Sequence, residues 1–527
     1  MADLLHDLLI RSAERTPRAA ALAYRHSKLD YSTLALEVMR CSSALLELGL
    51  PRCARVGVYM EKRLETVVSV FGAAAAGGVF VPINPLLKPE QVAYILRDCN
   101  VRVLVTSAER LAALGPALGE CVDLKAVLCV GGKTGSLNAV PVLSWEEALA
   151  RADERKAHRV IDADMAAILY TSGSTGKPKG VVLSHRNMVA GAKSVAQYLE
   201  NRPEDRILAA LPLSFDAGFS QLTTAFHVGA SVALINYLVP RDVVEAIQRH
   251  RITGLTAVPP LWIQLASLKW PDAARHSLRY IANTGGRMPR ATLDALRALL
   301  PQTLVFLMYG LTESFRSTYL PPSELDRRPD SIGKAIPNAE VLVVREDGSL
   351  CDANEPGELV HRGALVSLGY WNDPVKTAER FKPAPGQAPG LVMPEIAVWS
   401  GDNVRRDEAG FLYFISRRDE MIKTSGYRVS PTEVEEVLYA TGLVGEAAAL
   451  GIAHPVLGQA IVVVAIDRAG GELDTQALLG LCRDRLPAFM VPARIIERKA
   501  SLPRNPNGKI DRKLLAQEFE GLFEAAA

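Results

Sequence analysis

The segment Tyr170–Gly180 has the sequence YTSGSTGKPKG, a mixture of hydroxyl, lysine and glycine residues that suits the binding of an anion. Glycines let the backbone turn so that several N–H groups converge on one anion, and Ser, Thr and Lys side chains add further donors. Gly173 and Gly176 are too close together for a Walker A loop. The segment therefore predicts a polyphosphate grip of another kind, and the alternative is a flexible surface loop.

Two other segments contain residues of types that suit nucleotide chemistry. In Tyr309–Glu313 (YGLTE), the aromatic face of Tyr309 can stack on a base, and Glu313 offers the hard oxygen ligand that Mg²⁺ prefers. The alternative for Glu313 is a surface carboxylate at the start of a helix. In Asn283–Arg287 (NTGGR), two glycines follow a predicted strand.

The elements that must position these residues are apolar runs that alternate with helical stretches. Most of the runs are rich in Val, Ile and Leu on both faces, as parallel strands buried under helices are. We therefore predict a large α/β domain with mostly parallel sheets. The predicted strands are Arg55–Met60, Val101–Ser107, Ala126–Val130, Ala166–Thr171, Ile207–Leu211, Ser231–Ile235, Gly254–Val258, Leu278–Ala282 and Leu304–Met308.

The pattern changes after about Pro337. Val341–Val344 and Glu358–His361 flank a turn and predict an antiparallel, barrel-like region. Further on, Ser430 is predicted to cap a helix, with Pro431 in its first turn and Glu433 completing a capping box. We place the domain boundary just before, so that residues 1–418 form the large domain and residues 419–527 form a small α+β domain.

Composition narrows the class of protein. Among 527 residues, 60 Lys and Arg balance 58 Asp and Glu, which argues against a partner such as nucleic acid that is bound by bulk charge. Seven scattered cysteines without a Cys-x-x-Cys pair suit neither a disulfide framework nor a structural zinc site, and we predict a reducing, cytoplasmic setting. The uncharged run from Thr66 through FGAAAAGGVFVPINP contains glycines and prolines, so it predicts a helix, a turn and a strand rather than a membrane span.

The ordered set of segments resembles the adenylate-forming superfamily, which includes acyl- and aryl-CoA synthetases, adenylation domains of nonribosomal peptide synthetases and luciferase-like enzymes. The resemblance covers essentially the whole chain. Two segments, LPLSFDAG and MYGLTESFRSTYLPP, look most like the exosortase-associated AMP-forming acyl ligases. The segments that carry the resemblance, in the order of the family, are Ala75–Pro85, Tyr170–Gly180, Tyr309–Glu313, Ser400–Asp402, Arg417–Val434 and Pro503–Lys509.

The resemblance implies a reaction in two steps. A carboxylate attacks the α-phosphate of ATP to give an acyl-adenylate and pyrophosphate, and the thiol of coenzyme A or of a carrier-bound phosphopantetheine then attacks the acyl carbon. Thr312 would touch the α-phosphate, and Glu313 would bind Mg²⁺. Asp402 would accept hydrogen bonds from the ribose, assisted by Arg417. The other nucleotide-binding positions implied are Thr171, Ser172, Gly173, Ser174, Thr175, Gly176, Lys177, Lys179, Gly285, Gly286, Tyr309 and Gly310.

The resemblance also assigns two lysines to the small domain. Lys509 matches the lysine that bridges the substrate carboxylate and the α-phosphate during adenylation. Lys423 matches the face that serves the thioester step, together with the thiol-channel turn Ser425, Gly426 and Tyr427. Asp419 falls at the hinge of the family, and a large rotation of the small domain is expected because one domain cannot present both faces at once.

The substrate pocket is less determined by the sequence. Asp216 follows Phe215 at the place where amino-acid-activating relatives bind the substrate ammonium, and the alternative is that Asp216 caps the following helix. Arg316 would favour a polar or anionic group if it pointed inward, and we expect it at the rim. The full set of predicted pocket residues is Phe215, Asp216, Ala257, Thr284, Met308, Phe315, Arg316 and Ser317.

Three classes of function remain open at this point. The leading prediction is an ATP-dependent acid–thiol ligase that makes an acyl-CoA from a small carboxylic acid, and its variant is an enzyme that loads an amino acid onto a carrier protein. The second class is an oxygenase of luciferase type. The third is a non-catalytic relative that binds nucleotide or acyl chains. We expect neither a nucleic-acid partner nor a membrane span.

Overall fold

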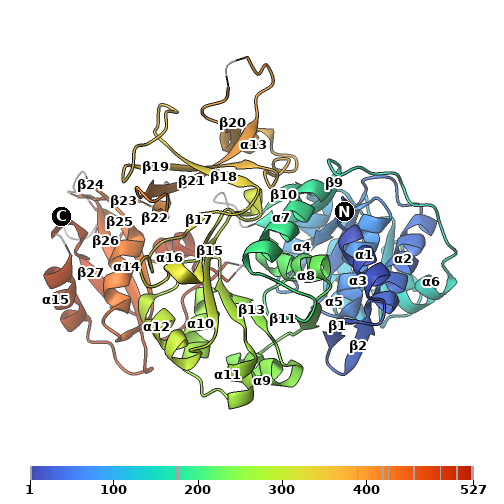
Figure 1. The fold of residues 1–527 in the computed structure, drawn as a ribbon, viewed down its shortest axis with the longest axis horizontal. Coiled ribbons are helices and arrows are strands. Elements are labelled where there is room, and N and C mark those ends of the chain that lie inside the picture. Colours follow the sequence, from blue (N-terminus) through green and yellow to red (C-terminus); the bar gives the residue numbers. More distant parts are fainter. Residues whose placement is uncertain are drawn as a thin grey trace.

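The computed structural model describes residues 3–171, 178–388, 390–417, 421–424, 427–454, 457–486, 488–505 and 508–523. These residues form two large sheets, a smaller antiparallel sheet and a C-terminal domain with a sheet of its own (Figure 1). The predicted fold class is confirmed: a large α/β domain with an antiparallel region is followed by a small α+β domain. Within the described part of the chain, no helix is both long enough and apolar enough to cross a membrane.

The first sheet has the order β10-β9-β4-β3-β5-β6-β8-β7, and its central strands are parallel. The run after Thr66 forms a helix, a turn with Gly77 at φ +79° and a buried strand, as predicted. The strands of this sheet are β3 (Arg55–Tyr59), β4 (Val79–Pro82), β5 (Val101–Ser107), β6 (Ala126–Val130), β7 (Gly135–Leu137), β8 (Val140–Ser144), β9 (Met165–Thr171) and β10 (Lys179–Ser184).

The second sheet has the order β17-β16-β15-β14-β13-β11-β12-β1-β2. The strands from β12 to β15 are parallel, so their carboxyl ends lie along one edge, which is where ligands bind in open α/β sheets. The strands are β1 (Ala20–Tyr24), β2 (Ser27–Asp30), β11 (Arg206–Ala209), β12 (Ser231–Leu234), β13 (Gly254–Ala257), β14 (Tyr280–Asn283), β15 (Leu304–Tyr309), β16 (Thr318–Leu320) and β17 (Lys334–Ala335).

Helices cover both sheets. The largest apolar cluster joins Phe80 of the first sheet and Phe306 of the second to helices that lie between them, including α2, α3, α7 and α8. Helices α9, α10 and α12 cover the far face of the second sheet. The helices of this domain are α1 (Asp7–Arg15), α2 (Tyr31–Glu47), α3 (Leu64–Ala75), α4 (Pro89–Asp98), α5 (Ala108–Leu114), α6 (Trp145–Arg151), α7 (His185–Tyr198), α8 (Asp216–Val228), α9 (Pro240–His250), α10 (Pro259–Ala266), α11 (Asp272–Ser277), α12 (Arg290–Leu299) and α13 (Pro374–Arg380).

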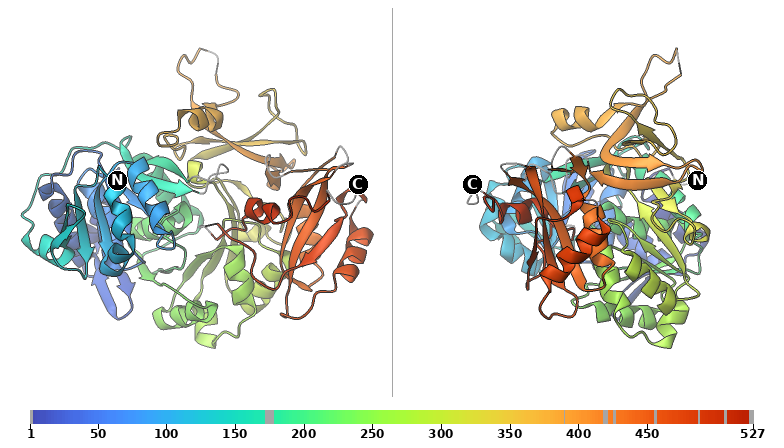
Figure 2. Two further views of the ribbon diagram at one scale, coloured as in Figure 1. Left: turned by 180° about the vertical axis from the view of Figure 1, so that it is seen from behind. Right: turned by 90° about the vertical axis from the view of Figure 1, so that its left-hand side faces the viewer.

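The antiparallel region follows the second sheet, and the small domain lies beside α10 and α12 in both views of Figure 2. The predicted hairpin is β18 paired with β19. The strands of the antiparallel region are β18 (Ala339–Val344), β19 (Pro356–Gly363), β20 (Phe381–Pro383), β21 (Ile396–Arg406) and β22 (Leu412–Arg417). The small domain consists of β23 (Ile422–Thr424), β24 (Tyr427–Val429), α14 (Pro431–Tyr439), β25 (Val444–His454), β26 (Gly458–Asp467), α15 (Thr475–Arg485), β27 (Arg494–Glu497) and α16 (Arg512–Gln517).

The start of α14 corrects one prediction. The helix begins at Pro431 with Ser430 at the N-cap position, as predicted, but the Ser430 hydroxyl makes no capping hydrogen bond. It donates instead to the carbonyl oxygen of Ile415 in β22, at 2.6 Å. The predicted capping box with Glu433 was therefore wrong, and the Ser430 side chain instead joins α14 to β22 of the large domain. The predicted boundary at Arg418 and Asp419 lies outside the described residues and stays a prediction.

Candidate active site

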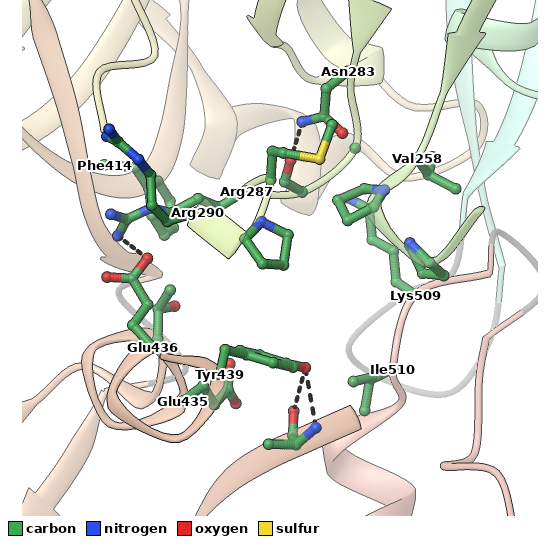
Figure 3. Close-up of a pocket in the computed structure, with 18 of the residues that line it drawn as sticks. Val258, Asn283, Arg287, Arg290, Phe414, Glu435, Glu436, Tyr439, Lys509 and Ile510 are labelled. Atoms are coloured by element: carbon green, nitrogen blue, oxygen red, sulfur yellow. Dashed lines mark hydrogen bonds and ion pairs between the residues drawn. The ribbon is translucent and has the colours of Figure 1, made fainter. Parts of the chain in front are cut away.

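A cavity of about 940 Å³ lies between the carboxyl edge of the second sheet and the small domain (Figure 3). It is lined by residues from β14, β15, β21 and β22, and by the turn of the small domain that contains Lys509. Of the residues predicted for nucleotide and carboxylate binding, it brings together Gly285, Gly286, Tyr309, Gly310, Asp402, Arg417 and Lys509. Segments separated by more than 200 positions in the chain therefore meet at one site, in the place that the parallel strands predict.

Asp402 organises one end of this cavity. Its carboxylate accepts from the Tyr309 hydroxyl at 2.5 Å and from Nε of Arg417 at 3.1 Å. The Asp402 residue is 3% exposed. Burial, and then the charge of Asp402, raise the pKa of Tyr309 well above its usual value, so the phenol stays protonated as a donor.

The Lys509 turn reaches the opposite wall of the cavity from the small domain. A Cβ atom built on Gly285, which has φ +75°, would lie 3.9 Å from Cε of Lys509. That distance is an ordinary van der Waals separation, so the Lys509 side chain packs beside the backbone after β14. Two ion pairs hold this turn to the rest of the small domain. They join Arg504 to Glu446 at 2.5 Å and Arg512 to Glu435 at 2.7 Å.

Thr312 and Glu313 lie in a short 3₁₀ turn, η2 (Thr312–Ser314), directly after β15. The Tyr370 hydroxyl donates to Oε1 of Glu313 at 2.6 Å. The ring of Tyr370 also lies 5.6 Å from Nζ of Lys179, a cation–π contact. Burial, with a smaller contribution from Lys376, lowers the pKa of Lys179. Sequence reasoning missed Tyr370, because it is about 60 positions from Glu313 and no spacing connects the two.

Part of the predicted phosphate loop is described. Thr171 ends β9, Lys179 begins β10, and the two residues pair across the antiparallel ladder. Ser172, Gly173, Ser174, Thr175, Gly176 and Lys177 lie outside the described residues. In the small domain, Lys423 and Tyr427 belong to β23 and β24, but their side chains are outside the description, as are Ser425, Gly426 and Asp419.

The predicted substrate-pocket residues are largely buried, and two expectations about them were wrong. Helix α8 begins at Asp216 with Phe215 at the N-cap position and no side-chain capping bond, so Asp216 is not the helix cap. Arg316 is 2% exposed and lies in the interior, not at the rim. Of this set, Met308 lines the cavity. Asp216, Ala257, Thr284, Phe315 and Ser317 are also less than a tenth exposed.

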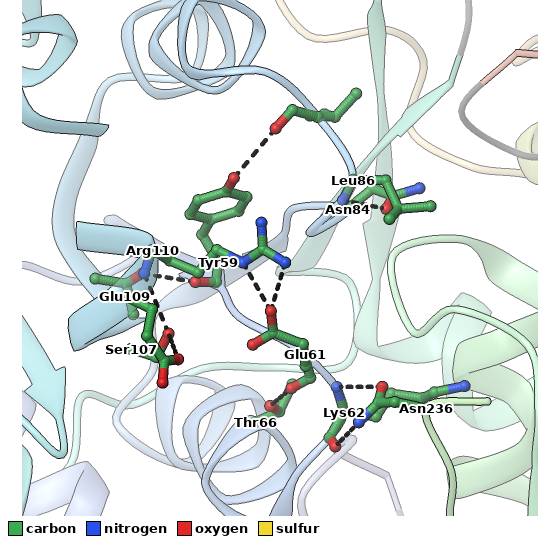
Figure 4. Close-up of polar contacts among 12 residues, drawn as sticks. Tyr59, Glu61, Lys62, Thr66, Asn84, Leu86, Ser107, Glu109, Arg110 and Asn236 are labelled. Atoms are coloured by element: carbon green, nitrogen blue, oxygen red, sulfur yellow. Dashed lines mark hydrogen bonds and ion pairs between the residues drawn. The ribbon is translucent and has the colours of Figure 1, made fainter. Parts of the chain in front are cut away.

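A buried lysine positions the loop before α8, and the sequence analysis did not identify it. Nζ of Lys62 donates to the carbonyl oxygens of Ala209, Ala210 and Leu211 at 2.9, 2.7 and 3.2 Å. Its backbone is fixed by the side chain of Asn236, as Figure 4 shows. Burial lowers the pKa of Lys62 to about 7. Lys62 thus provides hydrogen-bond donors for the carbonyl groups at the carboxyl end of β11, from which the chain leads to Asp216.

Arg287 links the two domains at the mouth of the cavity. It lies 3.0 Å from Asp330 of the large domain and forms an ion pair with Glu436 in α14 (Figure 3). Burial raises the pKa of Glu436, and the charge of Arg287 opposes this shift. In this structure Arg287 serves as a contact between domains.

Comparison with known proteins decides the family. The sequence model for the AMP-binding enzyme family matches residues 9–371, and the model for the AMP-binding enzyme C-terminal domain matches residues 433–509. The chain belongs to the AMP-binding enzyme family. This family assignment confirms the superfamily that the motifs predict, whereas the placement among exosortase-associated ligases stays a prediction.

Relatives in the family act on different acids and acceptors. The L-proline--[L-prolyl-carrier protein] ligase of Pseudomonas fluorescens is 31% identical over 536 residues, which cover 98% of this chain and 100% of that protein. A solved anthranilate CoA ligase in complex with anthranoyl-AMP has a TM-score of 0.89 at 26% identity and covers 99% of this chain and 98% of that one.

A solved o-succinylbenzoate coenzyme A synthetase from Bacillus subtilis, in complex with ATP and magnesium ion, has a TM-score of 0.82 at 26% identity. The match covers 97% of this chain and 99% of that one. The chain spans only 6% to 10% of the length of the first multimodular relatives, which are tyrocidine synthase 3 and linear gramicidin synthase subunits C and D of Brevibacillus parabrevis. Homologues of this chain are therefore both CoA ligases and adenylation enzymes that serve carrier proteins.

Proposed function

We propose that this chain is an ATP-dependent acid–thiol ligase. A carboxylate oxygen of the substrate attacks the α-phosphorus of ATP, the bond to the pyrophosphate oxygen breaks, and an acyl-adenylate forms. A thiol sulfur then attacks the acyl carbon, AMP leaves with the bonding electron pair, and the thiol proton passes to solvent. The observation that carries this proposal is the approach of Lys509 to Gly285 across the cavity that also contains Tyr309 and Asp402.

Each residue of the site has its own proposed role. Lys509 places a positive charge where the negative charges of carboxylate and α-phosphate converge, and Thr312 would touch the α-phosphate. Asp402 and Arg417 hold the ribose, and Tyr309 faces the base. Glu313 supplies a carboxylate oxygen of the kind that binds Mg²⁺, and a bound Mg²⁺ would neutralise phosphate charge. The described phosphate contacts would be Thr171 and Lys179.

Coenzyme A is our first candidate for the acceptor thiol, because a CoA ligase and a coenzyme A synthetase are among the solved relatives that match almost the whole chain. A carrier-bound phosphopantetheine is the second, because a carrier-protein ligase of the same length matches the chain from end to end. Both acceptors present the same thiol arm. The difference is that a carrier protein would also contact the surface around the entrance of the cavity.

Exchange of radioactive pyrophosphate into ATP tests the function directly. We expect exchange that depends on a carboxylic acid, measured over a panel of carboxylic and amino acids. The best acid is then offered with coenzyme A or with a phosphopantetheinylated carrier protein, and the thioester is identified by mass. Exchange that no acid stimulates would contradict the proposal.

Tyr370→Phe tests the predicted role of Glu313. A hydrogen bond to a charged group contributes about 1.5–3 kcal/mol, and Tyr370 donates one to Glu313. We expect the Mg²⁺ concentration for half-maximal exchange to rise about tenfold, and calorimetric titration with magnesium ATP to show the same weakening. Tyr413→Phe is the matched control, because Tyr413 likewise donates to a carboxylate, that of Asp407 at 3.1 Å, which has no proposed role in binding Mg²⁺. An unchanged Mg²⁺ requirement in Tyr370→Phe would remove Tyr370 from the site.

A further inference from the structure

Asp216 and Arg316 form a buried ion pair behind the η2 turn. Oδ2 of Asp216 lies 2.8 Å from Nη1 of Arg316, and its Oδ1 accepts from the Thr312 hydroxyl at 3.3 Å. Asp216 is 8% exposed and Arg316 is 2% exposed. Both oxygens of the carboxylate are therefore engaged from within the chain, and its charge is balanced by Arg316.

The backbone around Arg316 is built to bring this side chain inward. Phe315 has φ +56°, a conformation that costs free energy for a residue with a bulky side chain. Its ring is fully buried against Gly191, where an added Cβ would approach Cδ1 of Phe315 to 2.4 Å. On the other side, a Cβ on Gly310 would lie 3.0 Å from Cα of Arg316. Close packing therefore holds a strained turn that directs Arg316 toward Asp216.

We propose that Arg316 takes the position beside Asp216 that a substrate ammonium would occupy, so that the pocket selects carboxylic acids without an α-ammonium group. This inference rests on the proposed function. A second cation beside the pair would be repelled by Arg316, and to replace it the ammonium would have to expel a side chain that is 3% exposed. Nε of Arg316 is buried and has no hydrogen-bond partner among the described residues. A neutral oxygen acceptor on the substrate suits this unused donor, whereas a second carboxylate is disfavoured by Asp216.

Stable adenylate analogues test this selection without turnover. The probes are matched acyl-sulfamoyl adenosines, L-phenylalanyl with 3-phenylpropionyl and L-prolyl with cyclopentanecarbonyl, and calorimetry gives the affinity of each. We expect the wild-type protein to bind the acyl member of each pair at least about tenfold more tightly than the aminoacyl member. In Arg316→Met, the unpaired carboxylate of Asp216 should attract the ammonium and shift this ratio about 10²-fold toward the aminoacyl member.

Two further variants keep the test decisive. Arg297→Met removes an arginine of α12 that pairs with Asp326 at the surface, and it should leave the ratio at the wild-type value. The double variant Asp216→Asn/Arg316→Met removes both charges, so it avoids an unpaired buried carboxylate. Its ratio should lie between those of the wild type and of Arg316→Met, because a neutral pocket neither attracts nor repels the ammonium by charge but still desolvates it.

The possible results separate this inference from the proposed function. Preference of the wild-type protein for the aminoacyl probes, or an unchanged ratio in a folded Arg316→Met variant and in the double variant, would overturn the selection while the ligase function stands. Failure of every probe to bind, together with acid-independent pyrophosphate exchange, would overturn the ligase function and this inference with it.

Discussion

Lys509→Ala is expected to lower the rate of adenylate formation by about 10²–10³-fold, which corresponds to about 3–4 kcal/mol. The lysine reaches from the small domain to the large-domain wall of the cavity, beside Gly285, where the carboxylate and the α-phosphate would meet. Its turn is held by Arg504 and Arg512, so the charge is preorganised and costs little to position during the reaction.

The measurement has two parts. Pyrophosphate exchange reports the first half-reaction, and thioester formation from supplied acyl-adenylate reports the second. The variant should lose the first and keep the second, because the proposed thioester step uses another face of the small domain. Lys499→Ala is the control, because Lys499 is an exposed lysine of the same domain that lies 3.7 Å from Glu497. Adenylation at the wild-type rate in Lys509→Ala would exclude the proposed role.

Gly218→Ala is expected to destabilise the large domain by about 3 kcal/mol, the upper part of the range for overpacking. Gly218 belongs to the first turns of α8, and a Cβ there would lie 1.6 Å from the carbonyl oxygen of Pro212. The helix backbone fixes the position of the Cβ atom, and the carbonyl oxygen is itself a backbone atom, so neither can rotate away. The helix or the loop that leads to Asp216 has to move.

Thermal and denaturant unfolding measure this loss of stability. The affinity for the acyl-sulfamoyl adenosines should fall in parallel, because the displaced loop leads directly to Asp216. Gly480→Ala is the matched control. Gly480 lies inside α15, and an added Cβ there would meet nothing within 4 Å. That change should stabilise the protein by about 0.4–1 kcal/mol, since alanine restricts the unfolded chain. Equal melting temperatures for Gly218→Ala and the wild type would contradict the packing argument.

Sequence reasoning reached the parts of this protein that depend on local pattern. The buried run before Tyr309 predicted β15, and the parallel sheet predicted for such runs is present, so that Tyr309 and Gly285 line the same cavity. Contacts made by turns and by distant segments escaped it. Arg316 was expected at the rim because nothing in the sequence reveals that Phe315 takes a positive φ and turns the next residue inward.

Other misses have the same physical origin. Ser430 has the type and place of a helix cap, yet its hydroxyl donates to Ile415 of the large domain and makes no capping bond, and the local sequence does not reveal this contact with another element. The same holds for Tyr370, whose partner Glu313 is distant in the chain. Lys62 was overlooked because a lone lysine is usually solvated, and its three carbonyl acceptors become neighbours only in the folded sheet.

The ion pair between Arg287 and Glu436 makes the resting orientation of the small domain depend on ionic strength. Each side chain is about one third exposed, so dissolved ions reach the pair. Charges that water reaches attract one another over about 8–10 Å at physiological salt and over about 30 Å in dilute buffer. A rotation of the small domain would separate the two charges, and dilute buffer would resist that rotation more than a salty one does. Dissolved salt should therefore make rotation of the small domain easier, because it weakens the attraction between Arg287 and Glu436.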